Sequence, residues 1–254
     1  MPRTDPSPRH SRGLNRFATG WVSASAALCG RVAVLAPHLD DAALSLGATI
    51  PAAVRSGADV RVVTVFAGDR DSTVAASWWD ERGGFATLGR AAEARQSEDA
   101  EACRTLGATP VWLPFADATY GQEVSDEELW NAVRPNLADA DLVLAPGFPL
   151  MHEDHVRVCR LARARVDKDR LGFYVEQPYA AWLRSGSSSR RPAVDEIDRL
   201  EGTWRRVRSG PVHWAAKRRA VRAYGSQLAP LKQPLADVTK YELARGGETI
   251  ALPT

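Results

Sequence analysis

The chain has 254 residues, 44% of them hydrophobic, which is enough to bury the core of one α/β domain of generous size. Its 33 basic and 31 acidic residues leave a net charge of +2, which gives no electrostatic reason to expect nucleic acid as a partner. The three cysteines, Cys29, Cys103 and Cys159, are odd in number and lack metal-type spacing, so we expect a reducing, cytoplasmic location rather than a disulfide framework.

The N-terminal residues 1–15 are rich in Pro, Arg and Ser, and we expect them to form a mobile tail before one domain that spans residues 16–254. A basic start followed by the apolar residues 17–28 is similar to a secretory signal. Gly20, Ser23 and Ser25 interrupt that stretch, however, and it runs directly into the first predicted strand, so we expect no cleaved signal. No segment approaches the ~20 apolar residues that a membrane span needs.

From residue 31 the hydrophobic pattern alternates between strands and helices. A strand over 31–36 precedes a helix over 42–56, and the β-branched residues of 60–66 predict a second strand inside a sheet. A long loop follows, and the elements predicted after it are a helix over 90–106, a strand over 111–113, a helix over 126–137, a strand over 141–145, a helix over 154–166, a strand over 171–176, a flexible Gly-Ser loop over 185–189 and a helix over 213–224. Residues from 230 onward show no clear pattern. The alternation is typical of a single-domain, Rossmann-like three-layer sandwich with a mostly parallel sheet.

The first predicted strand ends in the sequence Pro37-His38-Leu39-Asp40-Asp41. Proline stops the strand and helix-forming residues follow, so one imidazole and two carboxylates lie where open α/β sheets bind ligands. His38 and Asp41 are three residues apart, close enough to bind one divalent ion, and Asp40 is left for another role. The alternative is that Asp40 or Asp41 caps the following helix, since aspartate is a preferred N-cap residue.

A second motif, His152-Glu153-Asp154-His155, follows the strand predicted over 141–145. The two motifs hold three of the five histidines in the chain. Both follow the carboxyl ends of predicted parallel strands, so we expect them to meet at one edge of the sheet. His38, Asp41 and one later histidine would then form a three-ligand site with an open position, as catalytic zinc sites do.

Together the motifs resemble those of the PIG-L/LmbE-like metal-dependent N-deacetylases, which have PHxDD at a strand end and HxDH later in the chain. The familiar forms are PHPDDE and HPDH, which differ from this sequence at Leu39, Ala42 and Glu153. None of these differences affects a predicted ligand, and they indicate a branch with a different substrate. Weaker similarities extend over the sequences Arg95-Gln-Ser-Glu98-Asp99 and Tyr224-Gly-Ser226-Gln227.

The resemblance implies a zinc site formed by His38, Asp41 and His155. The same ligands also accept Fe²⁺, Co²⁺ or Mn²⁺. An LmbE-like, Rossmann-like fold is implied as well.

The resemblance further implies three catalytic residues. Asp40 would be the general base that deprotonates water, and His152 would stabilise the oxyanion and protonate the leaving amine. Asp154 would orient His152, as carboxylates commonly do for a working imidazole. Amide hydrolysis needs a nucleophile, charge stabilisation and a proton for the departing nitrogen, and the two motifs supply all three.

The reaction expected from the resemblance is removal of an N-acetyl or other N-acyl group from an N-acetylglucosamine-like sugar on a small molecule, with a natural-product glycoside as the leading substrate. One alternative is a thiol-cofactor deacetylase of the mycothiol-pathway type, which Leu150 disfavours because some such enzymes have tyrosine there. Another is a non-catalytic metal-binding or sugar-binding protein of the same fold. The presence of Asp40 and every ligand disfavours it.

Four residues outside the motifs are candidate substrate contacts. Trp78 and Trp79 lie in the predicted loop 67–89, where their rings either stack on the substrate or pack the loop onto the core. Arg95 either reaches the substrate or a motif carboxylate, or is a surface arginine paired with Glu98 or Asp99. Tyr174, with Glu176, is expected to line the same cleft from a strand end. The tryptophans expected only to pack are Trp182, Trp204 and Trp214.

Overall fold

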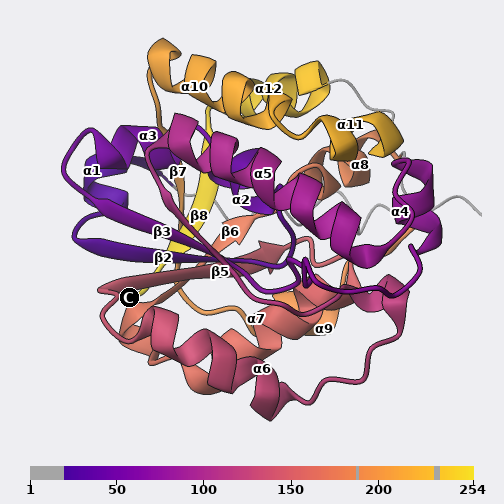
Figure 1. Ribbon diagram of the computed structural model, residues 1–254. Helices are drawn as coiled ribbons and strands as arrows, with labels where there is room; N and C mark the ends of the chain where they lie inside the picture. The colour runs from indigo at the N-terminus through magenta and orange to yellow at the C-terminus, as the bar shows by residue number, and fades with distance from the viewer. Residues whose placement is uncertain (1–19, 187–188, 232–234) are drawn as a thin grey trace, which may run out of the picture.

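An eight-stranded sheet runs through the centre of the protein in the order β1-β7-β8-β6-β5-β2-β3-β4. The computed structural model describes residues 20–186, 189–231 and 235–254 (Figure 1), so the predicted tail over 1–15 and part of the Gly-Ser loop lie outside the described residues. The strands are β1 (Trp21–Ser23), β2 (Arg31–Ala36), β3 (Asp59–Thr64), β4 (Thr109–Trp112), β5 (Leu142–Phe148), β6 (Leu171–Val175), β7 (Thr203–Arg208) and β8 (Glu248–Leu252). β8 is antiparallel to β6 and β7, and the other neighbouring pairs are parallel. The prediction of one domain with a mostly parallel sheet is confirmed.

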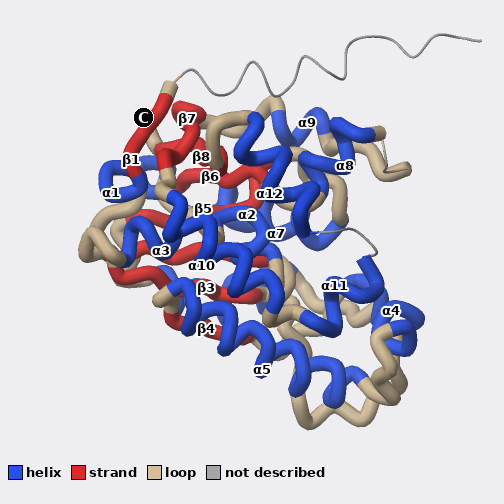
Figure 2. The backbone as a smooth tube through the Cα atoms, turned by 90° about the horizontal axis from the view of Figure 1, so that it is seen from above, coloured by secondary structure: helices blue, strands red, loops and turns tan. Residues whose placement is uncertain are grey.

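Helices cover both faces of the sheet (Figures 1 and 2). One face carries α1 (Ala24–Ala27), α2 (Asp41–Leu46), α3 (Thr49–Val54), α5 (Leu88–Leu106) and α10 (Pro211–Arg222), and the other carries α6 (Asp126–Val133), α7 (Glu153–Arg165) and α9 (Val194–Ile197). The remaining helices are α4 (Trp78–Arg82), α8 (Tyr179–Ser185), α11 (Gly225–Leu231) and α12 (Leu235–Ala244). Because strand side chains alternate, Val32 and Val34 belong to the hydrophobic cluster on one face, and Ala33 and Leu35 to that on the other. No helix among the described residues has the length and apolar character needed to cross a bilayer.

The predicted helix over 42–56 is two helices, α2 and α3, which separate at Gly47. A Cβ on Gly47 would lie 2.3 Å from the carbonyl oxygen of Ala43 and 2.8 Å from Cγ of Lys217, so only glycine allows α10 to approach this closely. The predicted helix over 126–137 likewise ends early, at Val133, and continues as a 3-10 turn over Arg134–Leu137.

The sequence pattern missed β1, β7, α12 and β8. The clearest gaps lie between residues 176 and 213, where only the Gly-Ser loop over 185–189 was predicted although the interval contains β7, and after residue 230, where no clear pattern was found although α12 and β8 follow. β7 contains three arginines and buries only Trp204 and Val207, so its hydrophobic signal is weak. Its place in the sheet depends on pairing with β1 and β8, which are distant in sequence.

A lysine inside the protein joins α10 to the C-terminal elements. Lys217 is fully buried, and its Nζ lies 2.5 Å from Oε2 of Glu242 and 2.7 Å from Oε1 of Glu248. Glu248 also accepts hydrogen bonds from the backbone N–H groups of Ala48 and Thr49, where α3 begins. Burial raises the pKa of Glu242 to about 8, although Lys217 opposes this. The cluster therefore fixes the break between α2 and α3 to β8.

We expect Lys217→Ala to lower the free energy of unfolding by about 3–5 kcal/mol, because removal of the cation leaves two carboxylates buried without a counter-charge. Urea unfolding followed by circular dichroism measures the loss. Arg219→Ala, an exposed residue on the same helix, is the matched control and should change stability by less than about 0.5 kcal/mol. Equal stability of the two variants would show that the buried ion pairs make no net contribution.

Candidate metal centre and substrate pocket

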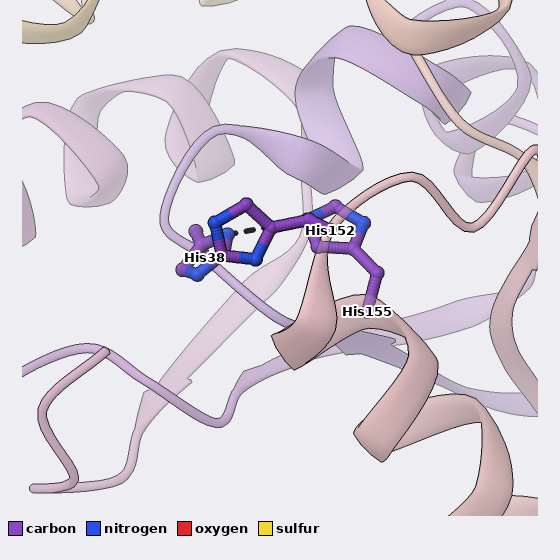
Figure 3. Close-up of side chains that lie close together, drawn as sticks. All are labelled: His38, His152 and His155. Atoms are coloured by element: carbon purple, nitrogen blue, oxygen red, sulfur yellow. Dashed lines mark hydrogen bonds between the residues drawn. The ribbon is translucent and has the colours of Figure 1, made fainter. Parts of the chain in front are cut away.

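The two sequence motifs meet because their strands are neighbours in the sheet. β2 and β5 pair in parallel, so the loop after β2 and the segment between β5 and α7 leave the sheet at the same edge. Figure 3 shows His38 on the first of these segments, and His152 and His155 at the start of α7. The three imidazoles offer nitrogen atoms that all lie within 4.8 Å of one another.

Three donor atoms at this edge, two from imidazoles and one from a carboxylate, lie closer together. Nε2 of His155 is 3.2 Å from Nδ1 of His38 and 3.3 Å from Oδ2 of Asp41, and Nδ1 of His38 is 3.5 Å from the same oxygen. Zinc ligands about 2.0–2.1 Å from a tetrahedral ion lie about 3.3–3.4 Å from each other. The predicted set of His38, Asp41 and His155 therefore has the spacing of three corners of a tetrahedral site.

Carboxylates outside this triangle hold both rings in a suitable orientation. Oε1 of Glu176 lies 2.8 Å from Nδ1 of His155, and Oδ2 of Asp154 lies 2.9 Å from Nε2 of His38. When each ring donates its proton to its carboxylate, the lone pair of the other nitrogen points toward Asp41. Glu176 was expected to line the cleft, but it is buried and accepts the backbone N–H of Leu150 with its other oxygen.

The prediction that Asp154 orients His152 is wrong. The carboxylate is hydrogen-bonded to His38, whereas its closest approach to Nδ1 of His152 is 3.6 Å. Nδ1 of His152 instead accepts the backbone N–H of Asp154, at 3.2 Å, as the cap of α7. The carboxylate of Asp154 thus positions a candidate metal ligand, and only the backbone N–H of this residue contacts the second imidazole.

The surroundings of His38 and His155 favour protonated imidazoles when no metal is bound. Although burial opposes it, hydrogen bonds to Asp154 and Asp41 raise the pKa of His38 well above its usual value. The pKa of His155 is also raised, because the charges of Asp41 and Glu176 outweigh burial. Below these raised pKa values a proton occupies a nitrogen that a metal would need.

We expect zinc affinity to rise with pH for this reason. For each proton that the metal displaces, the apparent Kd increases about tenfold for every unit that the pH falls below the raised pKa values. Titration calorimetry in buffers of different ionisation enthalpy, between about pH 6 and pH 8, measures both Kd and the number of protons released. A Kd independent of pH over this range would contradict the protonated state of the free site.

Asp40 occupies the N-cap position of α2, but its side chain makes no capping hydrogen bond. Oδ2 of Asp41 accepts the backbone N–H of His38 at 2.8 Å, so neither carboxylate has the alternative capping role. Asp40 lines a pocket, where burial and the charge of Asp41 raise its pKa to about 7. A carboxyl group with a pKa near neutrality can both accept and donate a proton.

His152 has the opposite electrostatic environment. Burial, together with the charges of His38 and His155, lowers the pKa of His152 to about 3. The ring is therefore neutral, and because Nδ1 accepts a hydrogen bond, its proton is on Nε2. A neutral imidazole of this kind suits hydrogen bonding to a developing oxyanion better than transfer of a proton to the amine.

A cavity of about 450 Å³ opens beside the motifs. Trp78 and Trp79 both line it from α4, a short helix within the predicted loop, and Trp78 is 58% exposed. Nε1 of Trp79 donates a hydrogen bond to Oε1 of Gln227, at 3.4 Å, which holds α4 against α11. These positions favour substrate contact over packing of the loop.

Arg95 is not the surface arginine of the second alternative. It is buried in the cavity wall and forms an ion pair with Asp80 of α4, not with Glu98 or Asp99. The charge of Arg95 also acts on Asp40, opposing the increase in its pKa. Arg95 is therefore part of the pocket, with Asp80 as the partner that the sequence did not identify.

The prediction that Tyr174 contacts substrate is wrong. Its side chain is fully buried, and its hydroxyl donates to the carbonyl of Leu35 at 3.0 Å. Two other aromatic residues line the cavity instead, Tyr179, which the sequence did not single out, and Trp182, which was expected only to pack. The Tyr179 ring packs edge-on at 5.1 Å from His155 and 5.4 Å from Trp182. Their place just after β6, at the carboxyl edge of the sheet, is the one signal that could have indicated them.

Comparisons with known proteins place these motifs in a family. Residues 33–166 match the PIG-L family, described as GlcNAc-PI de-N-acetylase. The structure is similar to that of the A40926 pseudoaglycone deacetylase Dbv21, with 26% identity, a TM-score of 0.70 and coverage of 87% of this chain and 96% of that one. A triple mutant of a deacetylase from the teicoplanin biosynthetic pathway has 26% identity, a TM-score of 0.69 and the same coverage.

A third similar structure shares the fold alone. It is GalB, the 4-carboxy-2-hydroxymuconate hydratase from Pseudomonas putida KT2440, with 18% identity, a TM-score of 0.59 and coverage of 85% of this chain and 86% of that one. No curated protein matches this sequence.

Proposed function

The chain belongs to the PIG-L family of GlcNAc-PI de-N-acetylases, and on that basis we propose that it is a metal-dependent amide hydrolase that removes an N-acetyl group from an amino sugar. The observation that carries the proposal is the triangle of His38, Asp41 and His155 at the cavity, with the uncapped Asp40 beside it. Fold similarity would not suffice, because a hydratase shares it.

The donor set fits a divalent metal, with zinc as the first choice for two imidazoles and one carboxylate. His38, Asp41 and His155 would hold the ion, which supplies Lewis acidity for the amide carbonyl and lowers the pKa of water to about 7. Glu176 and Asp154 would keep the two imidazoles in the required tautomers.

The remaining steps belong to side chains of this protein. Asp40 accepts a proton from the attacking water, and the proton later passes to the departing nitrogen when the carbon–nitrogen bond breaks. His152 donates its Nε2 proton in a hydrogen bond to the developing oxyanion. The products are acetate and a free amine, so the reaction consumes one water and needs no other reactant.

The proposed substrate is an N-acetylglucosaminyl group on a natural-product glycoside. The 26% identity with the deacetylases for A40926 pseudoaglycone and from the teicoplanin pathway supports this class. Trp78 and Trp79 support it as well, because aromatic rings at the wall of a cavity can stack on a sugar or on an aromatic aglycone.

Acetate release tests the proposal. Zinc-loaded protein is incubated with an N-acetylglucosaminyl glycopeptide, N-acetylglucosaminyl-inositol and N,N'-diacetylchitobiose, beside the chelated protein and Asp40→Asn. Release that requires both metal and Asp40 is the expected result, and the preferred compound ranks the substrates. Absence of release from every compound by protein shown to contain metal would overturn the proposal and favour a binding protein of the same fold.

A further inference from the structure

A second pocket lies outside the candidate active site. It has a volume of about 300 Å³ and is lined by Arg184 in the last turn of α8, Arg206 in β7, Tyr241 and Ala244 near the end of α12, and Arg245 just after that helix. No acidic residue of the described chain lines it. Three guanidinium groups thus surround one cavity.

Among the carboxylates whose side chains the structure describes, none forms an ion pair with any of the three arginines. Arg206 lies over the ring of Trp21 at 5.8 Å and Arg245 over that of Tyr241 at 5.6 Å. These aromatic contacts hold the two side chains but do not neutralise their positive charges.

Two buried donors in the same lining also lack partners. Nε of Arg206 and the hydroxyl of Tyr241 are shielded from solvent, and neither has a hydrogen-bond partner in the described structure. Burial and, to a smaller extent, the charge of Glu242 raise the pKa of Tyr241, and the charges of Arg245 and Arg184 oppose the increase, so both arginines lie within electrostatic reach of the hydroxyl. Buried donors are rarely left without an acceptor, and here an acceptor is missing.

Helix ends explain only part of this arrangement. Cations are favoured at helix C-termini, which accounts for Arg184 in the last turn of α8 and Arg245 just after α12. Arg206 is on a strand, however, and the Tyr241 hydroxyl carries no charge. A bound anion would satisfy all four groups together.

We propose that this pocket binds a small molecule that carries a phosphate group or a comparable oxyanion. Guanidinium groups pair with such oxygens through two parallel N–H donors, and the tyrosine hydroxyl supplies a further donor. The cavity has the size of a small-molecule site rather than of a groove for an extended polymer.

The pocket is separate from the substrate cavity but shares a helix with it. Tyr179 and Trp182 of α8 line the substrate cavity, and Arg184 lines the second pocket about 7–8 Å further along the helix than Tyr179. The two cavities have no lining residue in common. An anion bound here can therefore coexist with substrate, and the inference does not rest on the proposed deacetylase activity.

Calorimetric titration with inorganic phosphate and with pyrophosphate, in low-salt buffer on the full chain, tests the proposal. The variant is Arg184→Ala/Arg245→Ala, and the control is Arg219→Ala/Arg222→Ala, which removes the same charge from exposed positions of α10. We expect at least one of the two anions to bind the wild-type protein and the control with equal affinity. The same anion should bind the pocket variant at least about tenfold more weakly.

Tyr241→Phe keeps every charge and removes only the hydroxyl, so it tests the pocket even if the double variant folds poorly. This substitution should weaken binding of the same anion without a change in the circular dichroism spectrum. Absence of binding to the wild-type protein, or equal affinity in the pocket variant, the Tyr241→Phe variant and the control, would overturn the proposal. In the second case the anion would be at the metal centre or on the general surface.

Discussion

Asp40→Asn is expected to retain bound metal and to lower kcat by about 10²–10⁴-fold, the range that a positioned general base contributes. Asparagine has nearly the same shape but cannot accept the proton of the attacking water. The expectation depends on Asp40 being free for this role, since it makes no capping hydrogen bond although it precedes α2. Steady-state acetate release, with the metal content of each sample measured by mass spectrometry, gives the result.

The pH dependence of the rate provides a second measurement on the same variant. Burial and the charge of Asp41 raise the pKa of Asp40 to about 7 in the metal-free protein, and a bound cation would lower it. The rate should therefore fall as the pH drops through that pKa, because the protonated carboxyl cannot act as a base, and this acid limb should be lost in Asp40→Asn.

Glu153→Gln is the matched control, because it neutralises an exposed carboxylate of the second motif and should leave kcat nearly unchanged. Wild-type turnover in Asp40→Asn would remove Asp40 from the mechanism. Loss of metal from that variant would show instead that Asp40 is a ligand.

The sequence was most informative where local chemistry alone determines position. Pro37 ends a buried strand, and polar residues that follow such strands come together because parallel strands end at one edge. The two motifs could therefore be grouped without knowledge of the strand order, and the choice of His155 rather than His152 as a ligand came from the family resemblance. Their spacing in the structure required the pairing of β2 with β5, which no local pattern specifies.

The sequence was least informative where tertiary pairing decides the outcome. Asp154 lies within the same motif as His152 and His155, yet its carboxylate binds His38, from another segment. Glu176 reaches His155 only because β6 lies beside β5. Tyr174 and Tyr179 are a further example. Tyr174 is buried within β6 and Tyr179 lines the cavity, and only the path of the chain at the end of β6 decides between these two positions.

The same argument applies to the C-terminal elements. β8 is five residues long and lies between β6 and β7, antiparallel to both, so its place depends on the sheet rather than on its own pattern. Lys217 and Glu248 then join this strand to α10 inside the protein, where buried charges cannot be predicted from an apolar pattern.

A pair of histidine variants distinguishes two possible sets of metal ligands, in which either His155 or His152 joins His38 and Asp41. We expect His155→Ala to lose metal affinity by at least about 100-fold, together with activity, and His152→Ala to keep its metal while kcat falls. Nε2 of His155 lies 3.3 Å from Asp41 and 3.2 Å from His38, at the spacing of a tetrahedral site, whereas Nδ1 of His152 is occupied by the backbone N–H of Asp154. Metal content after dialysis, and Kd from competition with a fluorescent chelator, measure the difference.

His213→Ala controls for removal of an imidazole, because His213 lies on α10, away from both motifs. It should retain metal and activity. Retention of metal by His155→Ala and its loss from His152→Ala would reverse the two roles. Loss of metal from both variants would mean that His38, His152 and His155, whose nitrogens lie within 4.8 Å of one another, bind the ion together and that Asp41 serves as their hydrogen-bonding partner. If only His152→Ala retains its metal, His152 is not a ligand in the wild-type protein. Its Nε2 is then free to face the oxyanion, which is the role that the lowered pKa of His152 favours.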